Sequence, residues 1–137
     1  TAREQLAAAG ISTSAIAFGG TTNSLVLNEL WNGTSWTEVA DLNAGREQLQ
    51  GCGLSTAALA IGGNEGDSPI GSAKTEEWNG TAWAEVGDLA TGRRLGGGLG
   101  TSSAGLAFAG QNASNTKLVT TEEFTNPVLA TKTVDVD

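Results

Sequence analysis

One sequence pattern occurs three times along this chain at nearly constant spacing. Arg3, Arg46 and Arg93 are 43 and 47 residues apart. The apolar segments 15–20, 58–63 and 105–110 show the same two offsets, so two separate landmarks share one register. A period of this length indicates units that bury their apolar faces against their neighbours. We therefore predict a single repeat domain with units at 1–43, 44–90 and 91–137.

Each repeat carries four short segments with strand character and no apolar stripe at helical spacing. The first segment consists of small residues, such as Gly-Cys-Gly at 51–53, which suits strands crowded around one axis. The second alternates Ile16 and Phe18 with Ala15 and Ala17, so both of its faces are expected to be covered. These patterns predict an all-β fold of three four-stranded units.

A hairpin is predicted between the third and fourth segments. Asn32-Gly33 is typical of a two-residue type I′ turn. With that turn, Trp31 faces Thr34 and lies diagonal to Trp36 on one face. Such a large apolar block has to pack on the next repeat. The predicted packing residues are Trp31, Trp36, Trp78, Trp83 and Phe124.

These residues resemble kelch-type β-propeller repeats, whose blades carry an apolar strand ending in a double glycine, then an aromatic residue and a Trp flanking a hairpin. The matching residues are Gly19-Gly20 with Trp31 and Trp36, and Gly62-Gly63 with Trp78 and Trp83. The resemblance covers two whole copies and about two thirds of the third, where Phe124 stands in. It implies a propeller with three four-stranded blades in this chain.

Three blades do not close a ring in the known range of about four to eight. The simplest solution is a two-fold dimer of six blades, a homo-oligomer that uses one interface twice. Alternatively, the missing blades belong to a longer chain, or the end blades dock on another protein of an assembly.

The composition argues against several functions. The chain has no His, Tyr or Met, which removes most general bases and nitrogen ligands and the ligands of a galactose-oxidase-like copper site. We therefore expect no catalysis, cofactor or metal. Seven Lys and Arg against 15 Asp and Glu give a net charge of −8, which disfavours nucleic acid and anionic membranes as partners. The single cysteine, Cys52, is expected to be a small buried side chain.

Candidate binding residues lie in loops of variable length and in the repeated arginine motif. The loop candidates are Asn23, Asn64, Glu65, Asp67, Gln111 and Asn112. Glu65 and Asp67 are also candidate Ca²⁺ ligands, although two acids make a weak calcium signal. The motif candidates are Arg3, Arg46 and Arg93, for which hydrogen bonding between blades and binding of an anionic ligand are the two alternatives.

The sequence Glu-Glu-Trp-Asn-Gly-Thr at 76–81 is similar to repeats in predicted virion and appendage proteins of marine bacteriophages. This resemblance implies a structural or adhesive protein of a virion, tail fibre or extracellular surface that engages a protein neighbour or a glycan. The alternative is an intracellular kelch scaffold that recruits a partner protein. The chain shows no apolar run long enough for membrane insertion and no signal peptide.

Overall fold

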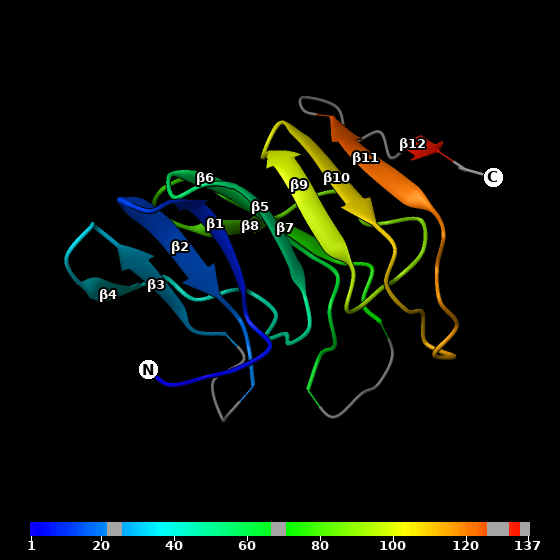
Figure 1. Ribbon diagram of the computed structural model, residues 1–137, viewed down its shortest axis with the longest axis horizontal. Coiled ribbons are helices and arrows are strands. Elements are labelled where there is room, and N and C mark those ends of the chain that lie inside the picture. The colour runs from blue at the N-terminus through cyan, green and yellow to red at the C-terminus, as the bar shows by residue number, and fades with distance from the viewer. Residues whose placement is uncertain (22–25, 67–70, 126–131, 135–137) are drawn as a thin grey trace.

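A computed structural model describes residues 1–21, 26–66, 71–125 and 132–134. Within these residues the protein forms three four-stranded antiparallel sheets and no helix (Figure 1). The predicted all-β class is confirmed, and the sheets have the form of blades. Asn23 and Asp67 lie outside the described residues.

Each sheet lies within one predicted repeat, and its strands are ordered as they occur along the chain. Sheet 1 consists of β1 (Ala7–Ile11), β2 (Ser14–Phe18), β3 (Asn28–Trp31) and β4 (Trp36–Val39). Sheet 2 consists of β5 (Gln50–Leu54), β6 (Ala57–Ile61), β7 (Thr75–Trp78) and β8 (Trp83–Glu85). Sheet 3 consists of β9 (Gly97–Thr101), β10 (Ala104–Phe108), β11 (Thr121–Thr125) and β12 (Lys132–Val134).

The first strand of each sheet lies where neighbouring sheets come closest. β5 lies beside both β1 and β9, as Figure 1 shows for the blue, green and yellow strands. A Cβ atom at Gly51 would be 2.9 Å from the carbonyl oxygen of Ala8, and one at Gly98 would be 2.8 Å from that of Gly51. The predicted crowding of the small-residue strands is therefore present.

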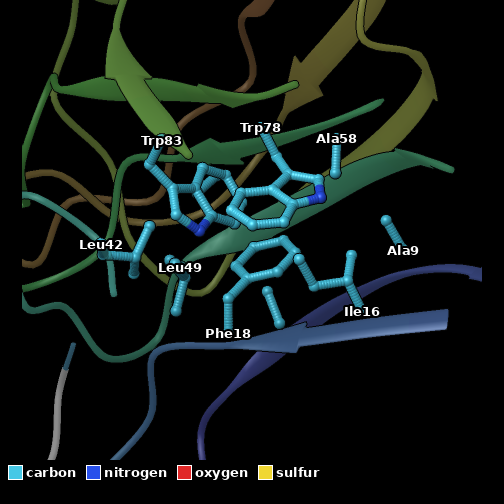
Figure 2. Packing of buried hydrophobic residues seen from close by; sticks show 10 residues of the cluster. Ala9, Ile16, Phe18, Leu42, Leu49, Ala58, Trp78 and Trp83 are labelled. Atoms are coloured by element: carbon cyan, nitrogen blue, oxygen red, sulfur yellow. The ribbon is translucent and has the colours of Figure 1, made fainter. Parts of the chain in front are cut away.

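The sheets pack with the large residues of one against the small and aromatic residues of the next. We call the packed interface between two neighbouring sheets a joint. In the joint between sheets 1 and 2, Phe18 packs edge to face on Trp83 with ring centroids 5.0 Å apart (Figure 2). Ile16, Phe18, Ala58 and Trp78 are almost completely buried in the same cluster. A second cluster joins sheets 2 and 3 and contains Cys52, Leu59, Ile61, Leu89, Ala107 and Phe124.

The hairpin between β3 and β4 differs from the predicted two-residue turn at Asn32-Gly33. Trp31 pairs directly with Trp36, and the Asn32 amide donates to the Ser35 carbonyl over 3.2 Å. Asn32 Oδ1 accepts hydrogen bonds from the backbone amides of Thr34 and Ser35. Because the side chain of Asn32 caps the turn, the turn is centred one residue later than predicted. Trp31 therefore faces Trp36 and not Thr34. Trp78 and Trp83 form the same pair in sheet 2.

Candidate binding surface

The side chains of the repeated arginines are buried beside the ends of strands. Arg46 is fully buried. Its Nη1 donates to the carbonyls of Gly62 and Lys74 over 2.9 and 2.7 Å. Its Nη2 forms a 2.9 Å ion pair with Glu76, whose side chain is 1% exposed. Burial lowers the pKa of Arg46, while the Glu76 carboxylate raises it. The guanidinium thus holds together the ends of two strands of its own sheet.

Arg3 and Arg93 repeat this arrangement with Glu29 and Glu122. The side chain of Arg3 is 3% exposed and that of Arg93 is fully buried. Burial of these side chains argues against the predicted alternative of binding an external anionic ligand. Among the described residues, the arginine side chains form hydrogen bonds only within their own repeats. The backbone carbonyls of Arg46 and Arg93, however, accept the amides of Gly20 and Gly63 from the preceding repeat over 2.9 and 2.8 Å, so the hydrogen bonds between repeats are made by the arginine backbone.

Two of these glutamates, Glu76 and Glu122, connect successive sheets. Glu76 Oε2 accepts from the backbone amide of Asn43 over 2.7 Å, and Oε1 accepts from that of Ala44 over 3.2 Å. Glu122 accepts from the amides of Ala90 and Thr91 in the same way. Each carboxylate therefore anchors the chain as it passes from one sheet to the next.

The variable connections gather at one end of the molecule, which we call the loop end. It comprises the second-to-third strand connections (residues 19–21, 26–27, 62–66, 71–74 and 109–120) and the segments entering β1, β5 and β9 (residues 3–6, 46–49 and 93–96). Isolated bridges join the two kinds of segment, as between Glu4 and Thr21, Glu47 and Asn64, and Arg94 and Gln111. Figure 1 shows these connections along its lower edge, opposite the short first-to-second strand turns.

A row of polar side chains links all three repeats across the loop end. Gln48 Nε2 donates to Gln5 Oε1 over 2.8 Å. Gln48 Oε1 accepts from Asn64 and Arg94, each over 3.2 Å. Arg94 also donates to Asn115. We call this set the polar row: Gln5, Thr21, Glu47, Gln48, Asn64, Arg94 and Asn115. Thr21 belongs to it through its 2.5 Å hydrogen bond to Glu47.

The backbone beneath the polar row is left-handed. Gln5, Gln48 and Leu95 have φ values of 58°, 54° and 55°. The Gln48 amide donates to the Gln5 carbonyl over 2.8 Å, and the Leu95 amide donates to the Gln48 carbonyl over 2.9 Å. Non-glycine residues seldom adopt this conformation, and here hydrogen bonds between adjacent repeats accompany it.

The predicted loop residues contribute unequally to this surface. Asn64 is 3% exposed and belongs to the polar row, with its Oδ1 unpaired among the described residues. Gln111 pairs its backbone with Arg94 and is partly exposed. Asn112 Oδ1 accepts from the amides of Ser114 and Thr116, so it stabilises its own loop. Gln48, Glu47 and Arg94 were not predicted, although they lie beside the repeated arginines in the sequence.

Glu65 interacts with a cation of its own loop. Its carboxylate accepts from Ser72 over 2.7 Å and from the Lys74 ammonium over 2.9 Å. Burial alone would raise the pKa of Glu65, but the Ser72 hydrogen bond and Lys74 together lower it. Within the described residues, no group of three or more His, Cys, Asp and Glu side chains is placed to hold a metal ion.

The aromatic packing residues differ with their position in the chain. Trp78, Trp83 and Phe124 are 1%, 6% and 7% exposed, because a preceding sheet covers them. Trp31 is only partly buried, and Trp36 is 49% exposed. The first pair belongs to sheet 1, which has no preceding sheet among the described residues.

Comparisons with known proteins inform the fold. No protein family model and no curated protein sequence matches the chain. The solved structure of YjhT superposes on 97% of this chain with a TM-score of 0.77 and 13% sequence identity. The match covers 46% of the YjhT chain, so this protein spans just under half of that structure. Among the described residues, no helix is long and apolar enough to cross a membrane.

Proposed function

We propose that this protein is a non-enzymatic binding and structural protein whose three sheets are consecutive blades of a kelch-like β-propeller. The side-by-side first strands β1, β5 and β9 and the repeated face-to-face packing support this arrangement. The absence of His and Tyr from the sequence supports a role without catalysis.

The observation that carries the binding function is the polar row, which spans all three repeats at the end where the variable loops gather. It offers carboxamide, hydroxyl, carboxylate and guanidinium groups on one surface. Such groups both donate and accept hydrogen bonds, as the hydroxyls of a sugar require. We propose a glycan as the ligand of the loop end, which fits an adhesive protein of a virion or surface appendage.

A glycan array probed with the fluorescently labelled protein tests this function. Arg94→Ala removes the cation that joins Gln48 to Asn115, and we expect it to abolish or strongly weaken binding. Thr34→Ala, an exposed change in a turn between the third and fourth strands, is the matched control and should leave binding unchanged. The proposal is contradicted if the protein binds no printed glycan, or if the two variants bind equally well.

The similarity of residues 76–81 to repeats in predicted virion and appendage proteins of marine bacteriophages supports the placement in a virion or appendage. Antibodies raised against the protein should label particles or appendages in electron micrographs of the source material. Labelling confined to the cell interior would contradict this placement.

A further inference from the structure

The three sheets leave two outer faces, one on sheet 1 and one on sheet 3. Each outer face has the composition of one side of the joints between neighbouring sheets. At each internal joint, the large-residue face of one sheet covers the first-strand and aromatic face of the next. One face of sheet 1 and one face of sheet 3 have no such neighbour among the described residues. The outer face of sheet 1 is equivalent to the first-strand and aromatic face at an internal joint. The outer face of sheet 3 is equivalent to the large-residue face that packs on it.

Strand register identifies the equivalent residues. Trp31 and Trp36 pair in sheet 1 as Trp78 and Trp83 pair in sheet 2. Trp36 is 49% exposed whereas Trp83 is 6% exposed. On sheet 3, Phe108 pairs with Gly97 as Phe18 pairs with Ala7 on sheet 1. Phe108 is 38% exposed whereas Phe18 is fully buried. Each outer face therefore exposes an aromatic side chain that the internal joint buries.

Backbone hydrogen-bonding groups match in the same way. Across the internal joints, the amides of Gly20 and Gly63 donate to the carbonyls of Arg46 and Arg93 over 2.9 and 2.8 Å. The next pair in this series is the Gly110 amide and the Arg3 carbonyl. These two groups lie on opposite outer faces, and neither has a hydrogen-bond partner among the described residues.

A second series gives the same result. The amides of Gln48 and Leu95 donate to the carbonyls of Gln5 and Gln48. The pair that continues it is the Gln5 amide and the Leu95 carbonyl, again one group on each outer face. If the outer face of sheet 3 packed on the outer face of a sheet 1, the contact would thus form two hydrogen bonds and bury one inserted aromatic side chain.

We propose that the occupant of each outer face is a second copy of this chain, docked head to tail. Phe108 of one copy packs against Trp31 and Trp36 of the other, and the same joint forms a second time on the opposite side. Two copies bring six sheets together, within the range of about four to eight that closed rings of this kind contain, whereas three copies would exceed it. This inference rests on the internal joints and does not depend on what the loop end binds.

One position distinguishes the new joint from the internal ones. Ala8 pairs with Ala17 as Gly51 pairs with Ala60 and Gly98 with Ala107. At each of these two glycines, a Cβ would lie under 3.0 Å from a carbonyl oxygen on the first strand of the preceding sheet. The methyl group of Ala8 occupies that position in the new joint, so the partner must shift outward. The joint between copies is therefore weaker than the internal joints.

Sedimentation velocity of the 137-residue protein across a dilution series tests the proposal. We expect a reversible dimer. Phe108→Glu and Trp36→Glu each place a charge in both joints of a homodimer, and each should weaken association by at least about 30-fold. Leu54→Glu changes a residue that is 53% exposed on the middle sheet and serves as the matched control. Ala8→Gly removes the misplaced methyl group and should strengthen association.

Mixing the two charged variants gives the decisive measurement. In a mixed dimer, the Trp36→Glu chain contributes an intact face of sheet 3, and the Phe108→Glu chain contributes an intact face of sheet 1. These two faces form one joint of wild-type composition. Association should therefore recover in part. Circular dichroism verifies that each variant is folded. The proposal is overturned if the wild-type protein is a monomer at all concentrations, if neither variant weakens the dimer more than Leu54→Glu does, or if mixing restores nothing.

Discussion

Arg46 Nη2 lies 2.9 Å from Glu76 Oε1, and the two side chains are 0% and 1% exposed. The other carboxylate oxygen of Glu76 receives the amide of Asn43 at the passage from sheet 1 to sheet 2. This pair therefore combines an ion pair within a sheet with an anchor between sheets. Arg93–Glu122 combines the same two roles, whereas Arg3–Glu29 repeats the ion pair and its carboxylate binds the N-terminal ammonium of Thr1.

Arg46→Met is expected to destabilise the protein strongly, because it leaves the Glu76 carboxylate buried without its cation. Loss of one partner of a buried ion pair costs about 3–5 kcal/mol, whereas loss of an exposed pair costs at most about 1 kcal/mol. Lys74→Met provides the comparison, since the side chains of Lys74 and Glu65 are 39% and 38% exposed. Urea unfolding followed by tryptophan fluorescence gives both values. Equal losses would contradict the structural role of Arg46.

The equivalent residues Trp83 and Trp36 should respond differently to truncation. Trp83→Ala opens a cavity against Phe18 and should cost about 3–5 kcal/mol of unfolding free energy. Trp36→Ala removes a half-exposed ring and should cost about 1 kcal/mol or less. Both changes are made in the Phe108→Glu background, so that association between copies does not affect the measurement. A large loss for Trp36 in that monomeric background would show that its ring stabilises the single chain.

Much of the fold could be predicted from local patterns in the sequence. The alternation of Ile16 and Phe18 with Ala residues predicted strands covered on both faces, and both large side chains are fully buried. The Gly-Cys-Gly segment predicted a crowded first strand, where Gly51 lies against the backbone of Ala8. These features were predictable because strand periodicity and side-chain volume act over a few residues.

The candidate site was harder to predict, because it depends on which repeats become neighbours. Asn64 was identified from its loop composition, but Gln48 and Arg94 contribute through hydrogen bonds to other segments. The left-handed backbone of Gln5 and Gln48 has no signal in residue type, since glycine and asparagine are the usual markers. The turn at Asn32 was placed wrongly because side-chain capping competed with the type I′ geometry that Asn-Gly favours.

Gly51→Ala tests how closely the first strands approach each other. The new Cβ would be 2.7 Å from Phe18 Cζ and 2.9 Å from the Ala8 carbonyl oxygen. Since the carbonyl belongs to the backbone, the strands have to separate, and the expected cost is about 1–3 kcal/mol. Thr37→Ala on exposed β4 is the control and should change stability by no more than about 0.5 kcal/mol. Urea midpoints measure both, and an unchanged midpoint for Gly51→Ala would mean that the first strands are further apart than described.

Cys52 should report the opening of the joint between sheets 2 and 3. This residue is 5% exposed, and its Sγ atom lies 3.9 Å from the Thr101 carbonyl oxygen on β9. Burial raises the pKa of Cys52 from 9.0 to about 11. Because the thiolate is the reactive form, a chromogenic disulfide reagent at pH 8 should react only when the joint opens, and much more slowly than with the protein in urea.

The same pKa shift predicts how stability depends on pH. The folded state holds the Cys52 proton more tightly than the unfolded state does, so its contribution is fully present below pH 9.0 and is lost as the pH rises towards about 11. Cys52→Ala should remove this part of the alkaline decline, and urea midpoints between pH 8 and pH 11 measure it. Reaction of the folded protein at the rate of a free thiol, or an alkaline profile that Cys52→Ala leaves unchanged, would contradict a closed joint around this side chain.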